Sequence, residues 1–330
     1  MPKTFRVTKE EPLLDIVSYG SRGRQAHIRL IPAEVDHIRR TVQRVPEVMV
    51  KVLSRASNDL SSAGRHIDYI SRKGDLALET DDDARLEEVS GKVLLEEWDL
   101  DVDNLRRQST LSVVNNREPP KLIHKLMFSM PPSTPPDKVL KAVRNLAREE
   151  FWGQHRYALA LHTDEPHPHV HLVLKAVSEQ GIRLNIKKAT LRHWRSEFSR
   201  HLRMLGVAAN ATERAVRGGG MKSRKDGIYR ASLRGESHFL RSRVVDAAQR
   251  ILTGEHRRQS GKHKLRETRA AIERGWTVAA NILERSGHPQ LAIDVRRFTA
   301  QLPSALTDQE QLMAELSLRA RDSRDLTPVR

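Results

Sequence analysis

The chain contains no cysteine, and this absence excludes several kinds of chemistry. A disulfide framework, a thiolate nucleophile and a zinc site with cysteine ligands all need that residue. No stretch approaches the ~18 consecutive apolar residues that a membrane-spanning helix requires. The first residues, MPKTFRVTKEEPLLD, also lack the apolar core and the small-residue cleavage site of a secretory signal. We therefore expect a cytoplasmic protein without membrane insertion.

Aromatic residues are scarce, and acidic residues are outnumbered by basic ones. Aromatic side chains make up 4% of the 330 residues and hydrophobic ones 38%, which indicates a chain that folds with much helix. Lysine and arginine number 58 against 42 aspartate and glutamate, so the formal net charge is +16. This surplus suits a polyanionic partner, because each phosphate that is neutralised releases condensed counterions. It does not identify the polyanion.

The spacing of apolar residues divides the chain into four segments. Residues 1–45 form a polar N-terminal extension, with one short helix expected at 33–44. In residues 46–215, strand and helix periods alternate, with strands expected at 47–55, 122–130, 156–163, 169–177 and 182–186, and helices at 58–74, 137–151 and 189–205. Residues 216–235 are a basic, glycine-containing linker. Residues 236–330 show helical periods alone, at 239–252, 263–285, 289–302 and 308–321, so the fold class is α+β with an all-helical C-terminal region.

Four of the fifteen histidines fall within the segment LHTDEPHPHVHLVLK. Side chains alternate along a strand, so His169 and His171 share one face, roughly 7 Å apart. His162 ends the preceding strand, and a short turn folds it back beside them. Three imidazoles on one hairpin can hold a metal ion and leave coordination positions open for a phosphoryl oxygen. His167 is then a spare ligand, an outer ligand or merely an exposed residue. Asp164 could orient an imidazole or accept a proton.

A histidine-rich surface turn is the alternative interpretation of this segment, and the shared hairpin favours the metal. Ligand softness alone prefers zinc, nickel or manganese over magnesium. The chain has no Ser-His-Asp spacing and no glycine-rich phosphate loop, so the nucleophile is water or another side chain. In HIDYISRKG, Tyr69 lies at the end of a helix among His66, Arg72 and Lys73. Nearby positive charge and a base favour ionisation of a phenol. Standing alone, the segment would fit a structural tyrosine better.

HIDYISRKG followed by HTDEPHPHVHLVLK resembles the MobA-like mobilisation relaxases. These belong to the endonucleases named for a His-hydrophobic-His pair, here His169 and His171 around a valine. The resemblance extends through HKLMFSMPP and KKATLRHWR and covers about residues 46–215. It implies a central antiparallel sheet flanked by helices, with Tyr69 as nucleophile, Asp164 as acidic helper, and His162 with the histidine pair as metal ligands. The tyrosine precedes the histidines, which is the relaxase order.

The activity that the resemblance implies is metal-dependent nicking and religation of single-stranded DNA at a transfer origin, through a 5′-phosphotyrosyl intermediate. Magnesium or manganese is the expected ion, with zinc not excluded. An accessory mobilisation protein and the coupling protein of a type IV secretion system are the expected protein partners. Many relatives have asparagine where this chain has Lys175. The residues expected to contact DNA are Arg72, Lys73, Ser129, Lys175, Lys187, Lys188 and Arg192.

Two other functions stay open. One is a metal-dependent phosphodiester hydrolase, in which the histidines activate water and Tyr69 is structural. The other is a non-catalytic DNA-binding mobilisation accessory protein, which retention of Tyr69 and the three histidines argues against.

Overall fold

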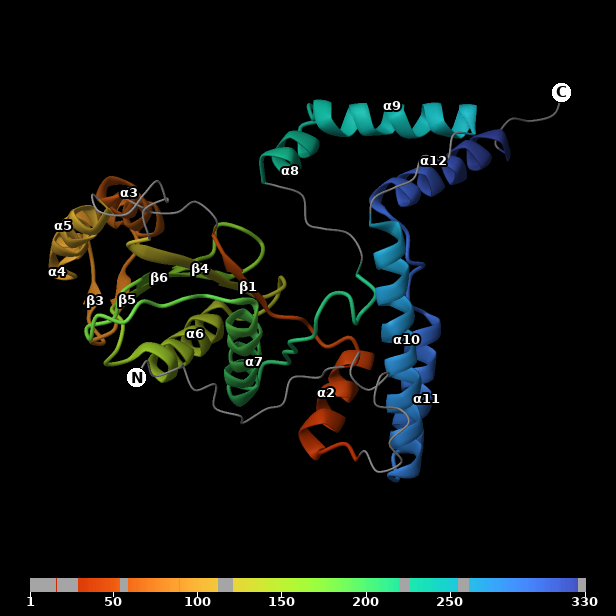
Figure 1. The fold of residues 1–330 in the computed structure, drawn as a ribbon, viewed down its shortest axis with the longest axis horizontal. Coiled ribbons are helices and arrows are strands. Elements are labelled where there is room, and N and C mark those ends of the chain that lie inside the picture. The colour runs from red at the N-terminus through yellow and green to blue at the C-terminus, as the bar shows by residue number, and fades with distance from the viewer. Residues whose placement is uncertain are drawn as a thin grey trace. The chain divides into compact units, whose positions relative to one another are not determined.

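The computed structural model describes Ile16 and residues 29–53, 59–88, 90–111, 121–219, 226–254 and 261–325. The chain forms two compact units, whose elements are labelled in Figure 1. The nuclease unit, as we name it from the resemblance above, contains Gln43–Ala211. The helical unit contains Leu14–Val42 and Thr212–Arg330.

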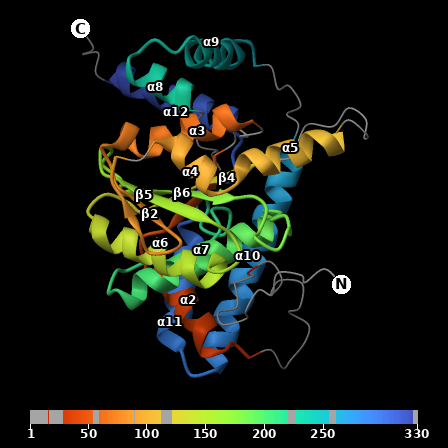
Figure 2. The ribbon, with the colours of Figure 1, turned by 90° about the vertical axis from the view of Figure 1, so that its left-hand side faces the viewer.

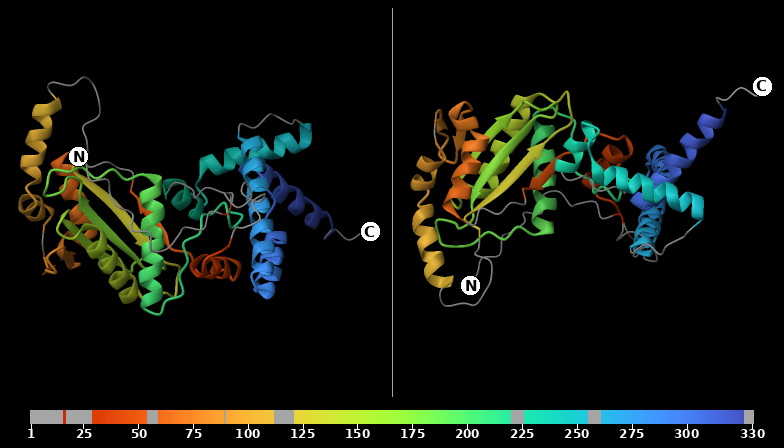
Figure 3. Two further views of the ribbon diagram at one scale, coloured as in Figure 1. Left: turned by 60° about the horizontal axis from the view of Figure 1, so that its bottom comes forward. Right: turned by 90° about the horizontal axis from the view of Figure 1, so that it is seen from above.

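A six-stranded sheet is the centre of the nuclease unit. Its spatial order is β1-β4-β6-β5-β2-β3, and the paired neighbours are antiparallel. The strands lie side by side in both panels of Figure 3. Their bounds are β1 Met49–Val52, β2 Leu78–Thr80, β3 Arg85–Leu86, β4 Ile123–Ser129, β5 Tyr157–His162 and β6 His169–Lys175.

Helices cover both faces of this sheet, as Figure 2 shows. One layer consists of α3 (Leu60–Ile70), α4 (Gly91–Glu97) and α5 (Leu100–Leu111), and the other of α6 (Pro136–Phe151) and α7 (Lys188–Met204). Because side chains alternate along each strand, the sheet contributes to a separate apolar core on each of its faces. Leu126 and Phe128 of β4 pack in the core beneath α6 and α7, whereas Val173 of β6 belongs to the core beneath α3 and α4.

The predicted α+β class, with a flanked antiparallel sheet and a helical C-terminal region, is confirmed. The expected strand at 182–186 differs, because the only pairing in this stretch is an isolated bridge between Val177 and Arg183. The acidic stretch at 79–88, in contrast, includes the end of β2 and all of β3. Arginines from elsewhere in the unit neutralise it through the ion pairs Glu79–Arg144, Asp81–Arg156 and Asp83–Arg148.

The helical unit has a core of its own. Val35 and Ile38 of α2 (Pro32–Val42) pack in one cluster with Trp276 and Leu283 of α10 (Lys262–Arg285) and with Val295. The expected helix at 33–44 is thus present, but its apolar face joins the C-terminal helices. The remaining helices are α8 (Asp226–Leu233), α9 (His238–Thr253), α11 (Pro289–Ala300) and α12 (Asp308–Asp325). Residues 220–225 of the predicted linker lie outside the described residues.

Among the residues that the structure describes, no helix combines the length and the apolar character needed to cross a bilayer.

Candidate active site

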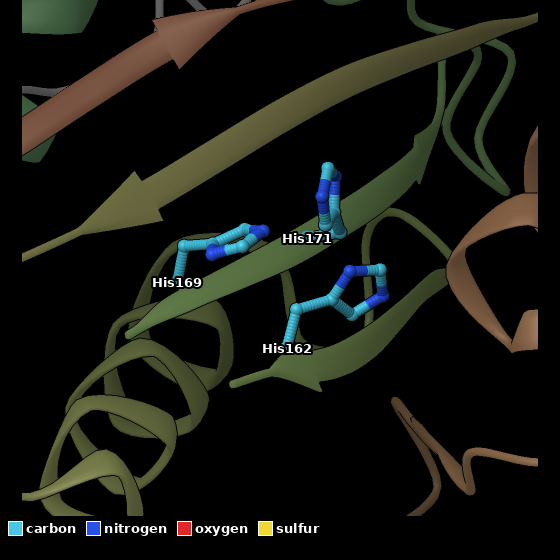
Figure 4. A group of neighbouring side chains, drawn as sticks. All are labelled: His162, His169 and His171. Carbon is cyan, nitrogen blue, oxygen red and sulfur yellow. The ribbon is translucent and has the colours of Figure 1, made fainter. Parts of the chain in front are cut away.

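Three histidines meet on the α3 face of the sheet, near one end of β5 and β6. His162 and His169 are direct cross-strand partners, and Ser129 of β4 pairs with His169 on its other side. His171 lies two residues further along β6, on the same face. Figure 4 shows the three rings pointing toward one another. The structure therefore brings together the three histidines that the sequence singled out.

The three rings are closely spaced and poorly exposed. The ring centroids of His162 and His171 are 4.6 Å apart, and each lies 5.2 Å from that of His169. One ligand nitrogen from each ring lies within 4.8 Å of the other two. His162 and His171 are 1% and 4% exposed.

Hydrogen bonds fix the tautomers of two rings. The Nε2–H of His162 donates to the carbonyl oxygen of Ile70 at 2.8 Å, which leaves the lone pair of this ring on Nδ1. The Nδ1–H of His169 donates to the carbonyl of His167 at 3.0 Å, which leaves its lone pair on Nε2. Nδ1 of His171 is buried and has no hydrogen-bond partner among the described residues. This set of imidazole nitrogens fits a divalent metal ion.

Electrostatics keeps two of the rings in the metal-binding form. Burial, with the nearby histidines, lowers the pKa of His171 to about 3. The pKa of His162 is also lowered, first by burial. Both imidazoles are therefore neutral at pH 7, and their lone pairs are available to a metal.

Tyr69 lies in the last turn of α3, beside the histidines. This helix begins at Asp59, whose side chain accepts a hydrogen bond from the amide of Ser62 at 2.7 Å. The apolar face of α3 is buried, whereas the Tyr69 side chain is 51% exposed. Its ring centroid is 5.9 Å from that of His171 and 6.2 Å from that of His162. The phenol therefore lies next to the histidines and is open to a large substrate.

The hydrogen bond from His162 to Ile70 joins this helix to the histidines, because Ile70 directly follows Tyr69. A second link is His66, one turn earlier on α3, whose ring stacks on Tyr69 at 6.0 Å and meets the His171 ring edge to face at 6.2 Å. Burial and then the charge of Lys125 lower the pKa of His66 to about 4. Lys125 itself is buried on β4, on the same face as Ser129, as alternation along this strand predicts.

Arg72 and Asp164 complete the group. The guanidinium carbon of Arg72 lies 5.5 Å from the centre of the Tyr69 ring, and Nη2 donates to Asp164 Oδ2. The same Nη2 is 3.4 Å from His162 Nδ1. Asp164 is thus paired with a cation beside the histidines. Burial opposes the shift, but a hydrogen bond from its own backbone amide and then Arg72 lower the pKa of its exposed carboxyl.

The other expected DNA contacts are dispersed. Lys73 is exposed in the turn after α3, and Ser129 is buried beside His169. His167 is exposed and reaches His169 only through its backbone. The basic residues at the start of α7 are exposed but belong to the helix layer on the opposite sheet face: Lys187, Lys188 and Arg192.

Lys175 lies on the histidine face, as strand alternation predicts, but it is 6% exposed. Its ammonium pairs with Asp103 at 3.6 Å and with Glu179 at 3.3 Å. Because its charge is already paired with these two carboxylates, Lys175 has a structural role, and we do not propose that it contacts DNA.

A second group of possible ligands, Glu149, Glu197 and His201, lies between α6 and α7. Arg200 donates to both carboxylates, at 2.6 Å for Glu197. The group is therefore an ion-pair network centred on a cation.

Residues 69–204 match the family model described as "Relaxase: MobA/VirD2-like, nuclease domain". The matched segment begins at Tyr69 and contains the three histidines and Asp164. This segment is similar to the nuclease domain of the MobA/VirD2-like relaxases.

One solved chain, described as "Molecular Basis of Vancomycin Resistance Transfer in Staphylococcus aureus", is 15% identical, with a TM-score of 0.34. The similarity covers 51% of this chain and 99% of that one. No curated protein sequence matches this chain. The assignment of the nuclease domain therefore rests on the family match and on its agreement with the residues described above.

Proposed function

We propose that the protein is a DNA relaxase that nicks one strand at a transfer origin, with Tyr69 as its nucleophile. The observation that carries this proposal is the exposed phenol beside a cluster of three buried or half-buried histidines. A half-exposed phenol against metal-binding groups suits attack on a polymer that approaches from solvent.

The metal-binding residues in this proposal are His162, His169 and His171. The orphaned, buried Nδ1 of His171 and the fixed tautomers of the other two rings support this role. When bound, a divalent ion supplies positive charge to the non-bridging oxygens of a phosphate. Three nitrogen ligands are compatible with manganese, magnesium or zinc, and we expect magnesium or manganese to support the activity.

The chemistry at Tyr69 is a transesterification. The phenolic oxygen forms a bond to the phosphorus, and the bond from phosphorus to the 3′ oxygen breaks. The leaving 3′ oxygen takes up a proton, and the phenol loses one. Asp164 is the group that we propose to receive or relay a proton, because its exposed carboxylate lies beside both Arg72 and the histidines. The phosphotyrosyl bond retains an activated phosphate, so the same site can rejoin the strand.

The substrate in this proposal is single-stranded or locally melted DNA, because pairing hides the attacked phosphate geometry. Arg72, Lys73 and Ser129 are the residues that we propose to contact the strand, because they lie next to Tyr69 or to the histidines. An accessory mobilisation protein and a secretion coupling protein are the proposed partners, and the proposed place of action is the cytoplasm.

The rival is a hydrolase in which the metal site activates water and Tyr69 is structural. A covalent adduct separates the two. We would incubate the protein and Mn²⁺ with single-stranded oligonucleotides that tile the DNA flanking its coding sequence. A 3′ label should remain with the protein on an SDS gel, and a 5′ label should appear in a free, shorter strand.

Tyr69→Phe should abolish both products and leave binding of the oligonucleotide nearly unchanged, because it removes only the attacking oxygen. Tyr157→Phe is the matched control, since Tyr157 is buried in the core on the opposite face of the sheet. Nicking by the Tyr69→Phe variant, or cleavage without any adduct, would favour the hydrolase.

A further inference from the structure

Arg72 lies between the nucleophile and one of the metal-binding rings. Its guanidinium is over the face of Tyr69, is bonded to Asp164, and approaches His162 Nδ1 to 3.4 Å. The Arg72 side chain is 36% exposed. One cation therefore contacts three groups to which the proposed function gives different tasks.

The contact with His162 involves the nitrogen that a metal would need. Nε2–H of this ring is committed to the carbonyl of Ile70, so the only in-plane lone pair of the ring is on Nδ1. A lone pair on an imidazole nitrogen serves one partner at a time. Either an N–H of Arg72 or a metal ion can use Nδ1, but not both.

The backbone around Arg72 is itself unusual. Arg72 and Lys73 both have left-handed φ angles, of 54° and 59°, immediately after the helix that carries Tyr69. Non-glycine residues adopt this conformation at a free-energy cost, and such residues cluster at functional sites. In this turn the Arg72 side chain reaches Asp164 and His162, which are distant along the chain.

We propose that Arg72 and the divalent ion compete for His162 Nδ1, so that metal binding releases the guanidinium to a phosphate of the bound strand. The inference rests on the proposed metal site. Once an ion holds Nδ1, its positive charge repels the nearby guanidinium, and a phosphate oxygen pair is the planar, bidentate partner that guanidinium prefers. Asp164 holds Arg72 near the site until the strand arrives.

The first test is Mn²⁺ binding to the full chain by titration calorimetry, without DNA. Arg72→Gln should bind Mn²⁺ roughly two- to tenfold more tightly than the wild type, the range that loss of one competing hydrogen bond gives. Lys73→Gln is the matched control, because it removes the same charge at the neighbouring left-handed position, and its affinity should stay within about twofold. Equal tightening in both variants would reduce the effect to general charge and overturn the proposal, as would unchanged or weaker binding in Arg72→Gln.

The second test measures affinity for a single-stranded oligonucleotide in the Tyr69→Phe background, with and without Mn²⁺. Adding Arg72→Gln should weaken binding roughly tenfold with Mn²⁺ and much less without it, because only the released guanidinium reaches the phosphate. An equal loss of oligonucleotide affinity with and without Mn²⁺ would overturn the proposal that metal binding releases Arg72 to the phosphate. Failure of the wild type to bind Mn²⁺ at all would instead refute the metal site of the proposed function, and this inference with it.

Discussion

The contact between α3 and α4 provides a sharp test of how the fold positions Tyr69. A Cβ atom added at Gly91, the first residue of α4, would lie 2.4 Å from the carbonyl oxygen of Gly64 and 2.9 Å from its carbonyl carbon. Asp68, next to Tyr69, accepts a hydrogen bond from the Gly91 amide at 2.6 Å. The two helices therefore touch backbone to backbone at Gly64, five residues before the nucleophile.

Gly91→Ala should separate these helices. The added methyl group needs about 1 Å more room than the backbone leaves, because ordinary contacts begin near 3.4 Å. Overpacking of this kind lowers the free energy of unfolding by about 1–3 kcal/mol. The obstacle is backbone rather than the end of a flexible side chain, so we expect a value near 2 kcal/mol, after the small gain of alanine over glycine in a helix.

The same displacement should reach the chemistry. A shift of about 1 Å in a reacting group can lower a rate by about a hundredfold. We therefore expect Gly91→Ala to form adduct one to two orders of magnitude more slowly. Mn²⁺ affinity should fall less than the rate, because the three ligands are on the sheet and only the hydrogen bond from His162 to Ile70 joins them to the displaced helix.

Denaturant unfolding and single-turnover adduct formation measure the two effects. Gly227→Ala is the control, since a Cβ there meets nothing within 4 Å. Wild-type stability together with wild-type rate in Gly91→Ala would refute the argument that this helix contact positions Tyr69.

Two further predictions concern the histidines. In calorimetry, Mn²⁺ binding should be at least tenfold weaker in His169→Ala and in His171→Ala, whereas His167→Ala should change it little. Wild-type affinity in both His169→Ala and His171→Ala would mean that the metal binds elsewhere. The hydrogen bond between His193 and Glu150, at 2.5 Å, raises the pKa of His193. The contribution of this pair to the free energy of unfolding is therefore complete below about pH 6.5 and is lost as the pH rises through the raised pKa. Glu150→Gln should therefore lower the free energy of unfolding more at pH 6 than at pH 9, and an equal loss at both values would contradict the linkage.

Much of the fold could be predicted from periodicity alone. The apolar alternation and amphipathic spacing of residues 122–205 predicted β4, α6, β5, β6 and α7 within one or two residues of their bounds. These elements bury one consistent face each, so local pattern and tertiary packing agree.

The acidic stretch was not predicted as strand, because aspartate and glutamate are poor strand formers. Its carboxylates pair with Arg144, Arg148 and Arg156, which lie more than sixty residues away in sequence. No local pattern carries that information. The same limit applies to α2, whose apolar residues indicated a helix but not that the C-terminal helices would cover it.

The candidate site divides in the same way. The strand period predicted that His169, His171 and Lys175 share a face, which the structure confirms. It could not show that the ammonium of Lys175 is buried against Asp103. Nor could it show that Arg72 turns back toward His162, since two consecutive left-handed residues without glycine have no sequence signature. The roles of the site residues stay predictions until the variants are measured.

The shared core of α2 with α10 and α11 has a consequence for the order of events during synthesis. The ribosome completes α2 early, and the entire nuclease unit then emerges before the partners of Val35 and Ile38 are made. The nuclease unit can fold while translation continues, since domains generally fold as units in the order of synthesis. The apolar core of the helical unit cannot be completed until Phe298 has left the exit tunnel of the ribosome. A nascent chain halted between these points carries a finished nuclease unit and an uncovered apolar helix, which makes it a substrate for chaperones.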